Sequence, residues 1–325
     1  MKKVAIIMGG FSEESSISLK SGQLIFENLC RKKYDPYKIY ISKEKWILKS
    51  NENNEYLINK GDFSVIINNK KLNFDFAFIA IHGTPGEDGI LQAYFDLLNI
   101  PYTGSNFHNS NITFNKKYCL SFLKDFGINV SNYIFINKNQ NFCKKNILKK
   151  IGIPCFIKPS KSGSSLGISK VNKENEFDYA LKKAFELDEE IIVESFLKGK
   201  EVSVGVYSFN KKKIKVLPIT EIISQNDFFD FESKYSGKSK EITPAKLPFN
   251  IERNIIKIAK KVYKILNLSG MSRAEYIIVK NKPFFIEINT IPGLSKESIF
   301  PKQLKSAGLS LSNFFKNIIE SSIKK

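Results

Sequence analysis

Carboxylates gather in the last predicted strand pair, SRAEYIIVK followed by PFFIEIN. Side chains alternate along a strand, so Phe285, Glu287 and Asn289 are expected on one face. A turn centred on Asn281 places Glu275 opposite Glu287. Two facing carboxylates in an apolar sheet repel each other unless a cation lies between them. Glu275, Glu287 and Asn289 are therefore predicted to bind Mg2+ or Mn2+ together with substrate phosphates. The alternative is a solvated face with ordinary ion pairs.

A second candidate site is the segment KPSKSGSSLG at residues 158–167. Small residues let backbone N–H groups approach an anion, and Lys158 adds positive charge, so a triphosphate is a suitable ligand. The segment does not match the Walker pattern, because a strand rather than a helix is predicted after the loop. Alone it could equally be a flexible turn. Together with the carboxylate hairpin it indicates Mg-ATP.

A third group lies near the N-terminus, where Gly9 and Gly10 are followed by Ser12 and Glu14 at the start of a helix. Glu14 could receive the ammonium group of a small polar ligand there. His82 follows a buried strand and precedes the glycine loop GTPGEDG. A packing turn and a capping histidine are the alternatives. The sharper hypothesis is a ligand site that contains both Glu14 and His82.

The elements that must position these residues follow an α/β pattern. Residues 3–8 and 74–81 predict buried strands, residues 17–29 and 90–98 predict helices, and a polar stretch separates the two pairs. Residues 1–104 are therefore expected to form an α/β domain of the doubly wound type. Its glycine loops follow strands, at the usual ligand-binding edge.

The rest of the chain predicts two further domains, at 105–195 and 196–325. A helix from Lys116 to Phe126 should end at Gly127, a natural cap. Strands CFIKP, ISKV and IIVES and a helix at 177–185 complete the second domain. Strands EVSVGVYSF and KIKVLPITEI, an amphipathic helix at 251–265 and the carboxylate hairpin form the third. The polar segment 224–245 is too long for a simple connection and is predicted to be a mobile lid.

Composition excludes several classes of protein. The chain has 325 residues, of which 42% are hydrophobic, and it contains no apolar run of the roughly 20 residues that a membrane span needs. Its N-terminus does not resemble a secretory signal, so a cytoplasmic protein without a membrane partner is expected. The four cysteines are far apart and predict neither a zinc site nor a disulfide framework, only buried reduced thiols.

The net charge of +19 raises the hypothesis of nucleic-acid binding. However, only three of the 51 basic residues are arginine, and the lysines are scattered among Asn and Ile rather than forming one stripe. A solvated lysine surface is therefore the preferred interpretation, with no nucleic-acid partner. In a chain so poor in arginine, Arg273 stands out as a candidate functional residue.

The order of the motifs GGFSEES, IHGTPGEDG, PYTGS, KPSKSGSSLG, VESF, KYSG and EINTIPGLSKES resembles the D-alanine–D-alanine ligase family of the ATP-grasp superfamily, over nearly the whole chain. The resemblance implies a three-domain ATP-grasp architecture with ATP clasped between the central and C-terminal domains. It also implies a reaction in which two D-alanines are joined at the expense of ATP, for peptidoglycan precursor synthesis. A homodimer is a further implication.

Carried onto this sequence, the resemblance implies a role for each matching residue. The implied ATP-binding residues are Lys116, Lys158, Ser164, Ser165, Glu194, Ser195, Leu197, Glu201 and Lys234. Two metal ions would be held by Glu275, Glu287 and Asn289. Substrate would be bound by Glu14, His82, Gly293, Ser298 and Ile299. Glu14 would face the amine of the first D-alanine and Ser298 the carboxylate of the second.

The implied mechanism proceeds through an acyl phosphate. The first carboxylate attacks the γ-phosphate near Lys234, and the second amine then attacks the resulting carbonyl group. Arg273, with backbone N–H groups near Gly293, would stabilise the oxyanion. Tyr235 would close the site by meeting Ser164 and Glu14.

The chain departs from the family at three positions. Asp is usual where Glu275 stands, which puts the geometry of the second metal in question. Asp-Lys often stands where this chain has Asn115 and Lys116, and Arg is common where it has Ser15.

Three alternatives remain open at this point. A ligase that makes D-alanyl-D-lactate is disfavoured by Tyr235. Another ATP-grasp carboxylate–amine ligase, similar to glutathione synthetase, is disfavoured by the EDG and KYSG motifs. A non-catalytic basic protein that binds phosphate groups would show strongly salt-dependent nucleic-acid binding and no need for Glu287.

Overall fold

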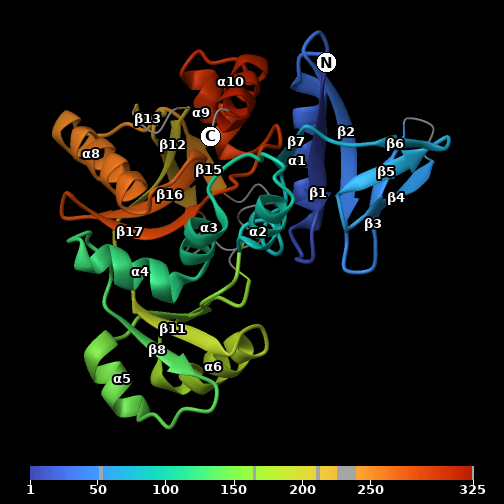
Figure 1. Cartoon of the computed structure of the whole chain (residues 1–325). Helices are drawn as coiled ribbons and strands as arrows, with labels where there is room; N and C mark the ends of the chain where they lie inside the picture. Colours follow the sequence, from blue (N-terminus) through green and yellow to red (C-terminus); the bar gives the residue numbers. More distant parts are fainter. Residues whose placement is uncertain (51–53, 164–165, 210–212, 225–238, 324–325) are drawn as a thin grey trace.

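The computed structural model describes residues 1–50, 54–163, 166–209, 213–224 and 239–323. Three sheets follow one another along the chain, and helices pack on each (Figure 1). This arrangement confirms the predicted α/β fold class. None of the helices within these residues has the length and apolar character needed to cross a membrane.

The first sheet has the strand order β6-β5-β4-β3-β2-β1-β7. Its strands are β1 (Lys2–Gly9), β2 (Tyr34–Ile41), β3 (Trp46–Lys49), β4 (Glu55–Asn59), β5 (Ser64–Ile67), β6 (Lys70–Leu72) and β7 (Phe76–Ile79). β1 is parallel to both β2 and β7, and its continuous apolar run is buried, as in central parallel strands. Helices α1 (Ser15–Asn28) and α2 (Ile90–Leu97) follow β1 and β7. The two predicted strand–helix pairs are thus confirmed.

The polar stretch between those pairs contains five strands that the sequence analysis did not predict. From β2 to β6 the pairing is antiparallel, so the strands extend the sheet as a meander. β3 to β6 are only three to five residues long, and exposed residues interrupt the apolar ones in β4 to β6. Their periodicity is therefore too short to stand out in the sequence.

The second sheet is antiparallel, in the order β10-β9-β11-β8. Its elements are β8 (Tyr133–Asn137), α5 (Lys144–Ile151), β9 (Cys155–Pro159), β10 (Ser169–Val171), a 3-10 turn (Glu174–Glu176), α6 (Phe177–Phe185) and β11 (Glu190–Ser195). Before this sheet come α3 (Phe107–Phe114) and α4 (Lys116–Asp125). The Asn115 side chain caps α4 by accepting from the Lys117 backbone N–H at 2.9 Å, and Gly127 has φ +71°. The predicted helix and its glycine stop are confirmed.

The third sheet runs β15-β14-β12-β16-β17, with β13 paired to β12. Its strands are β12 (Lys200–Ser208), β13 (Lys215–Val216), β14 (Thr220–Ser224), β15 (Ser239–Ile242), β16 (Gly270–Val279) and β17 (Lys282–Asn289). The amphipathic helix α8 (Phe249–Ile265) and α4 share one hydrophobic core with this sheet. α4 therefore lies against β17, which brings Lys116 close to the carboxylate hairpin.

After α9 (Ile299–Ser306), which contacts β12 of the third sheet, helix α10 (Leu311–Ile323) returns to β7 of the first sheet (Figure 1). Phe315 of α10 packs edge-on against Phe78, with ring centroids 5.5 Å apart, in a core that also contains Val4 and Ile6. The two ends of the chain thus share a core. The domain boundaries at residues 104 and 195 stay a prediction.

The expectation of buried thiols is only partly correct. Cys119 and Cys155 are buried, Cys30 is half-buried, and Cys143 is exposed. Cys143 directly precedes α5, whose apolar side is supplied by Ile147 and Ile151 instead.

Candidate functional site

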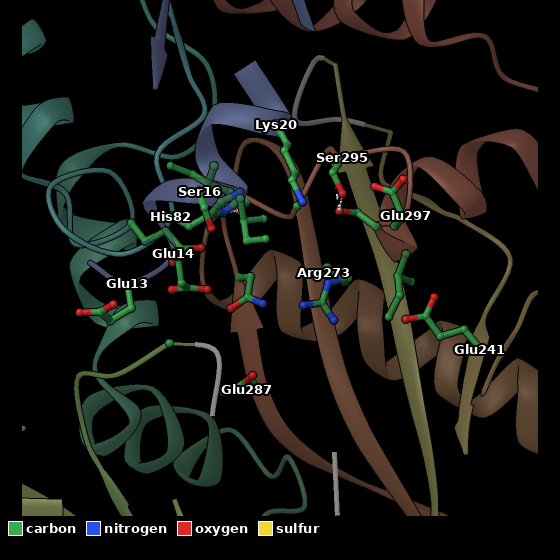
Figure 2. Close-up of a pocket in the computed structure, with 18 residues that line it drawn as sticks. Glu13, Glu14, Ser16, Lys20, His82, Glu241, Arg273, Glu287, Ser295 and Glu297 are labelled. Atoms are coloured by element: carbon green, nitrogen blue, oxygen red, sulfur yellow. Dashed lines mark hydrogen bonds between the residues drawn. The ribbon is translucent and has the colours of Figure 1, made fainter. Parts of the chain in front are cut away.

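A cavity of about 400 Å3 lies where the start of α1, the loop after β7, the β16–β17 hairpin and the segment before α9 converge (Figure 2). It is lined by Glu13, Glu14, Ser16, Ile17, Lys20, His82, Glu87, Gly163, Glu241, Arg273, Glu287, Asn289, Ile291, Gly293, Ser295, Glu297, Ser298 and Ile299. A small cavity of about 20 Å3 lies beside it, lined in part by Lys116, Ser162 and Glu287. The structure thus unites residues from all three predicted sites.

The carboxylate hairpin has the predicted register at its site end. Glu275 lies opposite Glu287, and Arg273 lies opposite Asn289. A bulge creates this register, because Tyr276 pairs with Phe285 and Ile286 is left over. Phe285 therefore faces the hydrophobic core beside Tyr276, not the side of Glu287. The expectation that Phe285 shares a face with Glu287 and Asn289 is wrong for this reason.

Each facing carboxylate has a side-chain cation. Arg273 forms an ion pair with Glu275 and donates to the Ser203 hydroxyl at 3.0 Å. The Lys116 ammonium lies 3.6 Å from a Glu287 oxygen and donates to the Ser162 carbonyl at 2.7 Å. Arg273 and Lys116 thus relieve the repulsion from which a metal was inferred, and the metal site stays a prediction.

The hairpin can still hold a divalent cation. Glu287 and Asn289 line the cavity and offer carboxylate and amide oxygen atoms as ligands, whereas Glu275 is buried. Within the described ranges, no three His, Cys, Asp or Glu side chains come together as a ready-made metal cluster. Mg2+ is commonly held by one or two carboxylates plus substrate phosphates, so this donor set fits it.

The residues implied to bind ATP lie partly beside the carboxylate hairpin and partly in the second sheet. Lys116 reaches the hairpin, as described. Lys158 forms an ion pair with Glu194 from the adjacent strand β11, and both are buried. Ser131 donates its hydroxyl to the same carboxylate. The charge of Lys158 is thus already balanced within the protein, and its contact with ATP phosphates stays a prediction.

Ser195, Leu197 and Glu201 lie where β11 passes into β12. The Ser195 backbone N–H donates to the Asn132 carbonyl at 2.8 Å, and its hydroxyl donates to the Ile151 carbonyl at 2.7 Å. Ser195 is therefore committed to internal hydrogen bonds, and a role in binding adenine stays a prediction.

Glu14 stands at the N-terminus of α1 and points into the cavity (Figure 2). It contacts the loop of the second candidate site, because a Cβ on Gly163 would lie 2.3 Å from a Glu14 carboxylate oxygen. Only glycine at 163 leaves this approach open. Glu14 and the predicted phosphate loop thus belong to one site.

His82 is held by both ring nitrogens. Nδ1 lies 3.0 Å from the Ile291 carbonyl, and Nε2 lies 3.2 Å from the Ser21 hydroxyl. A carbonyl can only accept, so Nδ1 donates and Nε2 accepts. Burial lowers the pKa of His82, which favours this neutral form although Glu14 opposes the shift. His82 therefore links α1 to the segment before α9 rather than presenting a ring nitrogen to a ligand.

Glu87 is a site residue that the sequence analysis missed. It lines both cavities, and its carboxylate accepts from the Gly83 backbone N–H at 2.9 Å. Burial, with the nearby charge of Glu14, raises the pKa of Glu87 to about 8. The sequence could have predicted Glu87 as a site residue. It lies in the glycine loop GTPGEDG after a buried strand, and such loops lie at the edge of the sheet where ligands bind.

Ser298, Gly293 and Ile299 form the opposite end of the cavity. The Ser298 hydroxyl accepts from the Ser295 backbone N–H at 3.1 Å and lies 2.8 Å from the Ser295 hydroxyl. A Cβ on Gly293 would come within 2.8 Å of Ser298 Oγ, so glycine preserves its place. Ile299 begins α9, whose N-terminus favours an anion at this end.

The predicted lid falls mostly outside the described residues. Lys234 and Tyr235 lie there, as do Ser164 and Ser165 of the phosphate loop. At its C-terminal side the segment forms β15, which pairs with β14. Glu241 of β15 lines the cavity and forms an ion pair with Lys302 at 2.8 Å.

Comparison with known proteins gives consistent results over the whole chain. The family model described as D-ala D-ala ligase N-terminus matches residues 3–105, and the one described as D-ala D-ala ligase C-terminus matches residues 122–320. A protein of Flavobacterium johnsoniae named D-alanine--D-alanine ligase is 50% identical over 99% of this chain and 100% of its own length. One of the same name from Christiangramia forsetii is 46% identical and covers 99% of this chain and 98% of its own length.

Solved structures agree with these relatives. The D-alanyl-alanine synthetase A of Vibrio cholerae has a TM-score of 0.89 at 26% identity and covers 100% of this chain and 99% of its own. The VanG D-Ala:D-Ser ligase of Enterococcus faecalis has a TM-score of 0.86 at 32% identity, with 99% of each chain covered.

Proposed function

The chain belongs to the D-alanine–D-alanine ligase family, and from this premise we propose that its cavity joins two D-alanines to D-alanyl-D-alanine. ATP drives the reaction and is converted to ADP and phosphate, and the product serves peptidoglycan precursor synthesis. The observation that carries the proposal is the position of Lys116, between the Ser162 carbonyl of the phosphate loop and the Glu287 carboxylate. A phosphate group there meets the loop, a cation and the metal-binding hairpin together.

The first step forms an acyl phosphate. Glu14 holds the ammonium group of the first D-alanine, so that its carboxylate is directed toward the phosphate loop. A carboxylate oxygen attacks the γ-phosphorus, and the bond to ADP breaks. Glu275, Glu287 and Asn289 would hold two divalent ions, Mg2+ or Mn2+, which supply positive charge to the phosphate oxygens when bound. Lys116 supports the same oxygens from the side of the loop.

The second step forms the peptide bond. The ammonium group of the second D-alanine loses a proton to water, and the neutral amine attacks the acyl carbonyl. The C–O bond to phosphate then breaks, and the leaving phosphate takes up the second amine proton. Arg273 lines the cavity, and we propose that with backbone N–H groups near Gly293 it stabilises the oxyanion. Ser298 and the N-terminus of α9 bind the carboxylate of this second D-alanine.

Further roles are proposed for residues away from the reacting groups. Glu194, Ser195, Leu197 and Glu201 hold the adenosine part of ATP, and Lys158 contacts its phosphates. As the family resemblance implies, Ser164, Ser165 and Lys234 bind ATP, and Tyr235 meets Ser164 and Glu14 to close the site. We also propose a homodimer that works in the cytoplasm, which light scattering and cell fractionation can test.

The function is tested by ATP-dependent phosphate release with Mg2+ and D-alanine, L-alanine, or D-alanine plus D-lactate or D-serine, with the products identified by mass. Release with D-alanine alone and formation of the dipeptide are expected. A mixed product formed in preference to the dipeptide would move the chain to a ligase with another acceptor. If the folded protein releases no phosphate with any of these acceptors, the ligase function is refuted.

A further inference from the structure

In the part of the chain that the structure describes, the cavity is lined by more acidic than basic side chains, and the end near Ser298 lacks a positive charge for a bound carboxylate. Among the described residues, six carboxylates line the cavity, and Lys20 and Arg273 are the side-chain cations. Arg273 is bound to Glu275. A second amino acid that places its carboxylate near Ser298 would also meet the exposed Glu297. Such an anion needs a cation close by, because like charges at short range are costly.

Lys20 is positioned to supply that cation. It belongs to the same face of α1 as Ser16 and Ile17, and all three line the cavity. Figure 2 shows its side chain entering the cavity from α1, on the side where Ser295 lies. Within the described part of the chain, no carboxylate lies within ion-pair distance of its ammonium, so none of the described acidic groups neutralises this charge.

The base of Lys20 is fixed relative to Ser298. The adjacent Ser21 hydroxyl accepts from the Leu294 backbone N–H at 3.0 Å and contacts His82 Nε2 at 3.2 Å. These bonds join α1 to the segment that carries Ser295 and Ser298. Although the Lys20 side chain is long and exposed, its origin is therefore held beside the end of the cavity where α9 begins.

We propose that Lys20 binds the carboxylate of the acceptor amino acid, together with the Ser298 hydroxyl and the N-terminus of α9. This inference rests on the proposed function and adds to it a residue of α1 that distinguishes acceptors by their negative charge. Lys20 selects for an amino acid with a free carboxylate over an uncharged amide of the same size.

The test is a charge series at position 20, with D-alanine as both substrates. Lys20→Arg should keep the KM of the acceptor site, Lys20→Met should raise it about tenfold, and Lys20→Glu should raise it further. The KM for ATP should not change. Lys32, in the exposed turn after α1, provides the control, because Lys32→Met and Lys32→Glu make the same charge changes away from the cavity.

A competition experiment separates charge recognition from a general loss of activity. D-alanine and D-alaninamide are supplied together, and the dipeptide and dipeptide amide are quantified by mass. Lys20→Met should lower the ratio of dipeptide to amide about tenfold relative to the native chain. If the native chain makes no measurable amide product, the acceptor KM values of the Lys20 variants test the inference by themselves.

The inference is overturned if Lys20→Glu and Lys20→Met keep the native acceptor KM, or if the product ratio stays constant while total turnover falls. In both cases the native chain still makes the dipeptide and the proposed function stands. Failure of the native chain to make any dipeptide would overturn both.

Discussion

Glu275 lies opposite Glu287 in the β16–β17 ladder, and the two carboxylates are bound by different cations from different parts of the chain. Arg273 precedes Glu275 by two residues on the same strand, whereas Lys116 comes from the start of α4. Glu275 is thereby tied to the sheet, and Glu287 is tied to the helix beside the phosphate loop. The pair thus joins the stable core of the third sheet to the side of the site where phosphate transfer is proposed.

Glu287→Gln is expected to lower Mg2+-dependent turnover about 100-fold or more, because a metal ion contributes several kcal/mol to phosphoryl transfer. The melting temperature should change little, since the Glu287 side chain is partly exposed. Turnover is measured by phosphate release over a range of Mg2+ concentrations. Glu241→Gln makes the same chemical change in the same cavity and should keep most activity. Native turnover in Glu287→Gln would contradict the metal-binding role.

Arg273→Met is expected to reduce the free energy of unfolding by about 3 kcal/mol, because it leaves the buried Glu275 carboxylate without its partner. The double variant Arg273→Met with Glu275→Met should recover most of that loss, since neither side chain then carries a charge. Chemical denaturation of both single variants and the double variant gives the coupling free energy. Additive losses would show that the two side chains stabilise the fold independently.

Local patterns predicted much of the fold, but not the pairings that depend on distant parts of the chain. The helix from Lys116 and its stop at Gly127 follow from an Asn cap and a glycine with positive φ, which are both local features. The strands β3 to β6 were missed because each has only three to five residues, too few for a clear alternation of apolar and polar side chains. The bulge at Ile286 was also missed, since strict alternation of side chains cannot reveal one unpaired residue.

The same limit applies to the site. Glu14, Glu287 and Ser298 were predicted and do line one cavity. The cations that balance the carboxylates were not predicted, because Lys116 is far from Glu287 in sequence. The Arg273–Glu275 pair had a local signal, since residues two apart on a strand share a face. His82 was predicted to lie near a ligand, and only the positions of Ser21 and Ile291 show that its ring is occupied.

Gly163→Ala is expected to raise the KM for the first D-alanine about tenfold with little effect on stability. The new methyl group would lie 2.3 Å from a Glu14 carboxylate oxygen, and the end of a flexible side chain moves more readily than a backbone. Glu14 would thus leave its place while the fold persists. Gly61→Ala, in an exposed turn of the first sheet, serves as the control. An unchanged KM would show that Glu14 does not hold the amine from this position.

Glu87→Gln is expected to change how stability depends on pH. The folded chain holds the Glu87 proton up to about pH 8, whereas an unfolded glutamate releases it near its ordinary pKa of 4.5. Between these values the folded state binds more protons, so raising the pH favours unfolding and stability falls. The substituted amide would stay neutral and its carbonyl oxygen would still accept from the Gly83 N–H, so the variant should lose this part of the slope.

The measurement is chemical denaturation of the native chain and Glu87→Gln from pH 5 to pH 8, without Mg2+ or ATP. Relative to the native chain, the variant should gain about 3 kcal/mol of unfolding free energy across this range, because each pH unit in which folded Glu87 holds its extra proton contributes about 1.4 kcal/mol. Glu27→Gln, on the exposed side of α1, should show no comparable gain. Parallel curves for the native chain and Glu87→Gln would mean that Glu87 is already ionised in the folded protein, and burial would then be offset by cations closer than Arg273.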